Sequence, residues 1–179
     1  MISILTNKNS MNTLLLRRRV AWIIWRLRLT AGDILSDFSA RLLIQKVAYI
    51  MKTKELLDME FNLHIHGPYS SELADIYMEL AREGDEVIKR LASQYKPRED
   101  EESIVQLIME YIGNYNNIEH GLKVLETATT IYDIYDYNKP KYTIKDAIEH
   151  AAWLKPWIED GDYINEALKL LKTLGLLKN

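Results

Sequence analysis

The 179-residue sequence contains no cysteine. Disulfides, cysteine-ligated zinc and thiol catalysis are therefore excluded. Its seven glycines are scattered singly, so the chain lacks the glycine-rich loop that cradles a phosphate. Arginines interrupt the apolar stretch LLLRRRVAWIIWRLRL, and no uncharged run approaches the roughly 18 residues that a membrane-spanning helix needs. This stretch also lacks the pattern of a secretory signal. We therefore expect a cytoplasmic protein with no transmembrane segment.

Charge is divided unevenly along the chain. Residues 1–54 hold ten Lys and Arg against two Asp, a net charge of +8, and residues 55–179 carry a net charge of −11. This asymmetry indicates either an anionic partner for the basic segment or charge pairing within the protein or a dimer. With 47% apolar residues, the chain has enough hydrophobic material for the core of one domain.

Hydrophobic residues recur at helical spacing through most of the sequence. The polar residues 1–12 are expected to form an irregular arm, and KPREDEE is expected to be a charged linker. Residues 86–95 fit either a strand or a helical turn. The predicted helices cover residues 13–29, 38–53, 71–83, 102–112, 118–136, 143–155 and 161–174. The sequence thus predicts a mainly α protein of about six helices, with a basic arm and helix in residues 1–37 and a helical domain in residues 38–179.

The stretch FNLHIHGPYS is the exception to this helical pattern. Apolar and polar residues alternate over 60–66, which predicts a short strand. Gly67 and Pro68 predict a corner, because glycine permits turn conformations and proline fixes φ. Ser70 then fits the N-cap of the next helix, and Gly84 its end. Thr143, with Asp146 three residues on, fits the cap of the helix predicted for 143–155. A helix, a strand and a helix in this order are similar to a winged helix.

Two segments carry a family resemblance. RLLIQKVAYIMK, and HGPYSSELADIYMELAREGD beyond the strand, resemble the YwgA-like family of small bacterial and archaeal proteins. The matching positions are Ile44, Gln45, Lys46, Tyr49, Gly67, Pro68, Tyr69, Ser70, Glu72, Leu73, Leu80 and Gly84. The Gly-Pro corner is also similar to that of the Panacea antitoxin-like domain. Neither resemblance implies a reaction or a cofactor. Both imply a helical, winged-helix-like regulatory or interaction module.

The basic helix is the first candidate site. Its aliphatic residues share one arc of the helix, and the rest is covered by Arg17, Arg18, Arg19, Trp22, Trp25, Arg26 and Arg28. Arginine neutralises phosphates, and tryptophan stacks on bases, so this face predicts nucleic-acid binding. One alternative is a helix docked on the acidic part of the chain, with its tryptophans in the core and its arginines in salt bridges. Another is a helix that binds a membrane surface or a partner protein.

A second candidate is a polar interaction patch beside the Gly-Pro corner. It consists of Gln45, Lys46, Tyr49, Gly67, Pro68 and Tyr69. These residues either present hydrogen-bonding groups to a partner or lock the packing of the corner. His64 and His66 alternate on the predicted strand, but no motif supplies further ligands, so no metal is predicted.

No catalytic constellation accompanies these candidates. Ser70 has no Gly-x-Ser-x-Gly elbow and no evident base. We therefore predict a non-enzymatic regulator or adaptor that binds nucleic acid through its basic helix. The alternative is a protein-interaction module, antitoxin-like or dimerising, that makes no nucleic-acid contact.

Overall fold

The computed structural model describes residues 2–113, 118–159 and 162–178, with side chains from Asn12 onward. This part of the chain forms nine α-helices, one 3₁₀ helix and one two-stranded sheet. The helices are α1 (Ile2–Arg26), α2 (Ala31–Ser36), α3 (Phe38–Thr53), α4 (Ser71–Glu83), α5 (Asp85–Ser93), α6 (Glu99–Gly113), α7 (Ile118–Tyr137), α8 (Ile144–Leu154), η1 (Pro156–Glu159) and α9 (Tyr163–Thr173). The predicted mainly α class is confirmed, and the helices outnumber the predicted six.

Local capping signals that were read from the sequence are present. The Ser70 side chain accepts a hydrogen bond from the Leu73 N–H and begins α4, and Gly84 ends it with φ +97°. Thr143 and Asp146 form a capping box at the start of α8. These interactions join residues three apart, which is why sequence alone reveals them.

The short helix α2 was not predicted. The predicted helix 13–29 ends before Thr30, and Thr30 caps α2 through a capping box with Asp33. A six-residue helix is too short to show a hydrophobic period. The segment 86–95, which fits either a strand or a helical turn, lies mostly in α5, so the helical alternative holds. Helix α5 packs against α1.

Two helix starts also differ from the prediction. The arm predicted for residues 1–12 is wrong, because α1 begins at Ile2. Residues 2–30 contain no glycine or proline, and adding a residue to an existing helix gains one hydrogen bond per residue fixed. The linker predicted at 96–102 ends early, since α6 begins at Glu99. Acidic residues occupy its first turn, where the helix dipole favours them.

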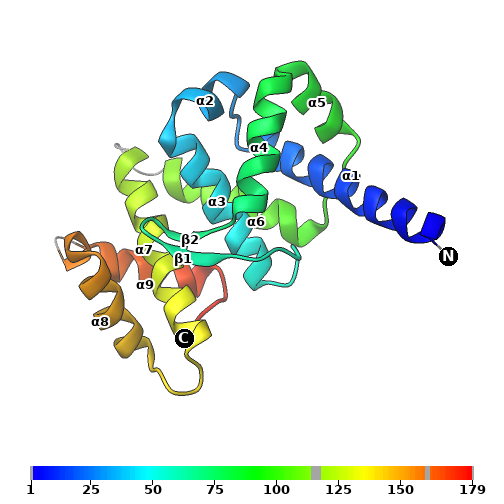
Figure 1. The fold of residues 1–179 in the computed structure, drawn as a ribbon. Coiled ribbons are helices and arrows are strands. Elements are labelled where there is room, and N and C mark those ends of the chain that lie inside the picture. The colour runs from blue at the N-terminus through cyan, green and yellow to red at the C-terminus, as the bar shows by residue number, and fades with distance from the viewer. Residues whose placement is uncertain (1, 114–117, 160–161, 179) are drawn as a thin grey trace.

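One hydrophobic core joins the helices. Residues from both sides of the predicted boundary at 37/38 pack in it, including Ile23, Ile34 and Val47. Ten of the 16 residues of α3 are buried, and α3 contacts α7. The sheet is a hairpin that lies between the α2–α5 helices and the α7–α9 helices (Figure 1). Within the described residues, no helix has both the length and the apolar character to cross a membrane.

The two tryptophans of α1 provide a matched test of this packing. Trp22 is 3% exposed and packs on Tyr95, with ring centroids 5.7 Å apart, whereas Trp25 is 53% exposed. Trp22→Ala is expected to lower the unfolding free energy by about 3–5 kcal/mol, and Trp25→Ala by less than about 0.5 kcal/mol. Urea denaturation followed by circular dichroism measures both. Equal losses would contradict the placement of α1.

Candidate functional site

The stretch 62–69 forms a hairpin rather than a single strand. Strands β1 (Asn62–His64) and β2 (Gly67–Tyr69) pair antiparallel with His64 opposite Gly67. The strand predicted for 60–66 is therefore wrong in extent, and Gly67 and Pro68 lie in β2 instead of at a corner. Gly67 has φ +81° directly after the turn. This left-handed conformation suits glycine, and it returns the chain along β1.

Two side chains of α3 bind the backbone of β2 and of Ser70, the residue that follows it, and we call them the α3 clamp. The Gln45 amide donates to the Ser70 carbonyl at 2.9 Å and accepts from the Ser70 N–H at 2.9 Å. Lys46 Nζ donates to the Pro68 carbonyl at 2.9 Å. Gln45 and Lys46 are both buried. The clamp thus satisfies backbone groups that would otherwise be buried without a partner.

A buried charge cluster lies beneath the hairpin. Lys155 pairs with Glu126 of α7, and His66 Nδ1 lies 3.5 Å from Glu126 Oε1. Burial lowers the pKa of Lys46 to about 7, an effect that the nearby charge of Glu126 partly offsets. Burial also lowers the pKa of Lys155, again opposed by Glu126. Three basic side chains therefore share one buried carboxylate.

The predicted interaction patch is brought together, but mainly as packing. Tyr49 is buried, with its ring 5.5 Å from that of Phe61. Gly67 and Pro68 are buried as well. Of the six residues, Tyr69 alone is exposed, at 37%. The geometry agrees with the second of the two interpretations, in which these residues lock the corner.

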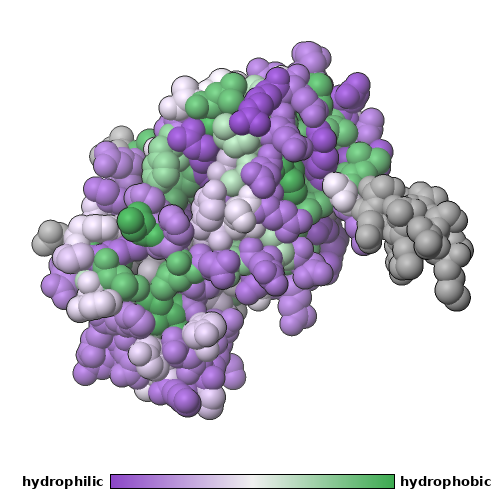
Figure 2. Space-filling model, in the orientation of Figure 1, coloured by the Kyte–Doolittle hydropathy of each residue, from purple (hydrophilic) through white to green (hydrophobic). Residues whose placement is uncertain are grey.

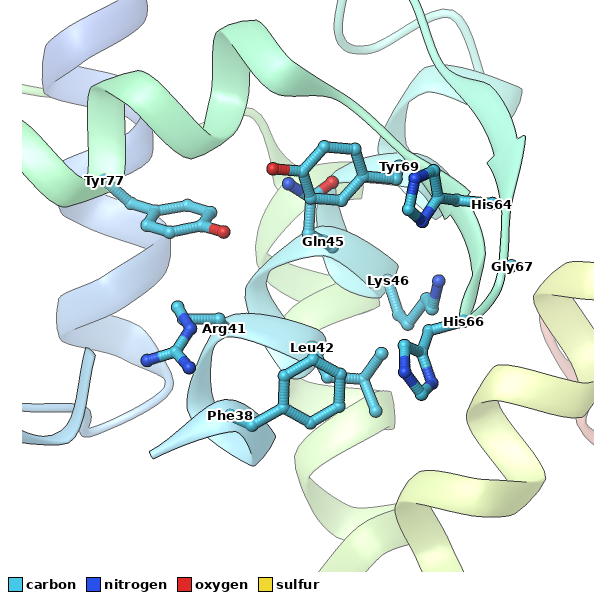
Figure 3. Close-up of a pocket in the computed structure, with 10 residues that line it drawn as sticks. All are labelled: Phe38, Arg41, Leu42, Gln45, Lys46, His64, His66, Gly67, Tyr69 and Tyr77. Atoms are coloured by element: carbon cyan, nitrogen blue, oxygen red, sulfur yellow. The ribbon is translucent and has the colours of Figure 1, made fainter. Parts of the chain in front are cut away.

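Beside the clamp lies a cavity of about 280 Å³, which we call the hairpin pocket (Figure 3). Its apolar walls come from Phe38 and Leu42 of α3, Tyr69 of β2 and Tyr77 of α4. The His66 ring packs on Phe38, with centroids 4.7 Å apart, and the His64 ring lies 5.5 Å from that of Tyr69. Tyr69 and both histidines are candidates from the sequence, but their spacing does not reveal that they line one cavity.

Arg41 is the lining residue that sequence reasoning missed. Its Nη1 donates to the Ile34 carbonyl of α2 at 2.8 Å. It forms no ion pair with any described residue, and no carboxylate lines the pocket. Figure 3 shows Arg41 and Tyr77 on one side of the pocket and the two histidines on the other. No sequence motif marks Arg41, because the acceptors of its guanidinium are backbone carbonyls of α2.

The histidines do not form part of a metal cluster in the described part of the chain. There, no group of three or more His, Asp or Glu side chains is placed to hold a metal ion. The prediction that His64 and His66 share one side of a strand fails, because β1 ends at His64 and His66 lies in the turn.

The arginines of the basic helix are mostly paired within the protein. Arg17 donates to Glu83 at 2.7 Å, and Arg19 lies 3.0 Å from the fully buried Glu101. Arg26 pairs with Glu102, and Arg18 donates to the Gln94 side chain at 3.1 Å. With Trp22 in the core, Trp25 and Arg28 are the residues of the predicted nucleic-acid face that stay largely exposed. This is the docked arrangement that the sequence left as the alternative.

No family model, no curated protein and no solved structure matches this chain. The resemblance to the YwgA-like family therefore stays a prediction, carried by the residues quoted for it.

Gly67→Ala is expected to destabilise the protein more than Gly84→Ala. Both glycines have positive φ, so each substitution carries about 1–3 kcal/mol of backbone strain. A Cβ at Gly67 would also lie 2.6 Å from Thr130 Oγ1, whereas a Cβ at Gly84 meets nothing within 4 Å. Thermal unfolding should therefore show that Gly67→Ala loses about 1–3 kcal/mol more unfolding free energy than Gly84→Ala does. Identical losses would show that β2 does not press on α7.

Proposed function

We propose that the protein is a non-enzymatic regulator or adaptor that binds a partner protein at the hairpin pocket. The observation that carries this proposal is a contrast of charge. Most arginines of α1 pair with carboxylates of the same chain. The described residues that line the hairpin pocket, in contrast, include the guanidinium of Arg41 and no carboxylate. The protein-interaction function is thus favoured over nucleic-acid binding along α1.

Nucleic-acid binding draws most of its free energy from cations that neutralise phosphates. Arg17, Arg19 and Arg26 would have to leave Glu83, Glu101 and Glu102 to do so. Glu101 is completely buried, and leaving it unpaired would be strongly unfavourable. Trp25 and Arg28 are exposed, but of these two only Arg28 is charged.

Apolar side chains around the hairpin support a protein partner. Ile65 at the turn is 75% exposed, and Leu63 of β1 is exposed as well. Leu63, Ile65 and Leu154 line a second cavity of about 400 Å³. Figure 2 shows apolar surface gathered over the hairpin and the neighbouring α7 and α8. Contiguous exposed apolar surface of this kind is typical of interaction sites.

The winged-helix-like arrangement belongs to the same proposal, with the hairpin as the wing. In that arrangement α3 precedes the wing, and its burial along most of its length leaves it unsuited to enter a DNA groove. The two side chains beside the pocket that could act as nucleophiles are both engaged in structural contacts, which supports a non-enzymatic role. Lys46 is 1% exposed and its amine donates to the Pro68 carbonyl, and the Ser70 hydroxyl caps α4.

The proposal is tested by selecting peptides that bind the protein from random short peptides displayed on phage. A mixed-sequence DNA duplex and its single strand test the nucleic-acid alternative in separate titrations. Tyr69→Asp places a carboxylate in the hairpin pocket. Tyr137→Asp is the matched control, because Tyr137 is 89% exposed and lies elsewhere, at the end of α7. Selected peptides should bind the control like the parent and the Tyr69 variant at least tenfold more weakly.

Anisotropy titrations should give DNA affinities no tighter than ordinary non-specific binding, about 1–100 μM at physiological salt. Peptides that bind the Tyr69 variant like the parent, or a failure to select any peptide, would overturn the pocket as the interaction site. Tighter, salt-dependent DNA binding would restore the nucleic-acid function.

A further inference from the structure

We infer that the hairpin pocket binds a ligand in which a carboxylate lies one or two carbon atoms from an aromatic ring, with the Arg41 guanidinium as its anchor. This inference rests on the proposed function, because it names the chemical group that is presented to the same pocket. It is carried by the charge of the pocket, by its walls and by its size.

The charge of the pocket comes from Arg41. Its guanidinium is permanently charged and partly buried, yet only one of its nitrogens has a described acceptor, at the end of α2. Three of the four partly buried arginines of α1 provide the contrast, since Arg17, Arg19 and Arg26 each meet a carboxylate, while Arg18 bonds the neutral Gln94 side chain. A charge withdrawn from water is stable only with a counter-charge or hydrogen bonds. The remaining donors of Arg41 thus leave room for an external anion.

The walls of the pocket suit a flat apolar group. Phe38, packed on His66, and Tyr69, packed on His64, place aromatic surface around the cavity. Figure 3 shows the Tyr77 hydroxyl directed toward the centre of the pocket, where Gln45 also contributes to the lining. The pocket thus combines apolar walls with a few convergent polar groups, the usual pattern of a ligand site.

The size of the pocket limits the ligand. Its volume of about 280 Å³ lies just below the roughly 300–1,000 Å³ of pockets that hold drug-sized molecules. One ring with its carboxylate fits this space better than a nucleotide or an extended chain does.

The charge balance favours a carboxylate over a phosphate. Arg41 supplies one permanent positive charge, while Lys46 is buried with its amine on the Pro68 carbonyl. A monoanion is therefore matched, and a dianion is not. The planar guanidinium also fits the two oxygens of a carboxylate in a bidentate manner.

Such a group has two sources, a small free aromatic carboxylate or the carboxyl-terminal aromatic residue of a partner protein. Phenylacetate represents the first, and the tripeptide Gly-Gly-Phe with a free carboxyl terminus represents the second. Phenylacetamide and amidated Gly-Gly-Phe are the uncharged controls. Backbone-amide NMR titration of the full-length chain follows all four.

Phenylacetate or the free tripeptide should shift the amide signals of α3, β2 and α4, and the matching amide should not. Tighter binding of the tripeptide than of phenylacetate assigns the source to a protein terminus. Equal or weaker binding of the tripeptide assigns it to a small carboxylate.

Substitutions then locate the anchor. Arg41→Gln is expected to weaken binding at least about tenfold, because it removes a charge-assisted hydrogen-bonded pair. Phe38→Ala removes one wall of the pocket and is the second variant, for the case that Arg41→Gln unfolds on losing its bond to α2. Phe38 is largely exposed, so Phe38→Ala is expected to keep its fold. Arg90→Gln on α5 is the matched control, because Arg90 is exposed and lies outside the pocket. It should bind like the parent.

The inference is overturned if neither carboxylate shifts the pocket signals, if both amides bind as well as their acids, or if Arg41→Gln or a folded Phe38→Ala binds like the parent. If selected peptides still depend on Tyr69 in that case, the proposed function stands and only the ligand chemistry is wrong. If carboxylates bind at Arg41 but no selected peptide depends on Tyr69, the partner-protein function fails instead.

Discussion

The Gln45 amide and the buried Lys46 amine of α3 hold the backbone at β2 and Ser70. This contact joins α3 to the hairpin and to the start of α4, and it places β2 against α7. Gln45 bonds both backbone groups of Ser70, the residue that caps α4. Lys46 bonds Pro68, while Gly67 lies so close to Thr130 that no Cβ fits between them. Helices α3, α4 and α7 and both strands are thus tied together at one point. The hairpin pocket opens beside it.

This arrangement places ionisable groups where burial disfavours their charge. Lys46 and Lys155 both lie near Glu126, and burial lowers the pKa of both lysines. Buried ion pairs of this kind contribute little to stability, because desolvation opposes their attraction. Their effect is to couple parts of the fold, since Glu126 belongs to α7, Lys155 follows α8 and His66 is at the hairpin turn. Partner binding at the hairpin would therefore act on groups that also anchor the carboxyl-terminal helices.

The features predicted from sequence are those that depend on near neighbours. The long helices follow from hydrophobic spacing, and the caps at Ser70 and Thr143 follow from residues three apart. The second strand was missed because it has three residues and contains proline. The partners of Arg17 and Arg19 were missed because they lie 66 and 76 or more residues away in the chain. Composition therefore left nucleic-acid binding and docking on the acidic part of the chain as two alternatives for the basic helix, without the partner residues, and no sequence pattern indicated the Arg41 pocket.

The claim that Lys46 is a buried anchor of the hairpin is tested most directly by the pH dependence of unfolding. Its pKa is about 7 in the folded protein and about 10.4 in an unfolded chain. Between these values the unfolded chain holds a proton that folded Lys46 has released, so the unfolding free energy rises with pH. Between pH 7 and 10, the unfolding free energy of the parent should therefore rise, relative to that of Lys46→Met, by up to about 1.4 kcal/mol per pH unit. Lys155 is present in both proteins, so its contribution cancels to first order. Parallel curves for the two proteins would contradict the buried position of Lys46.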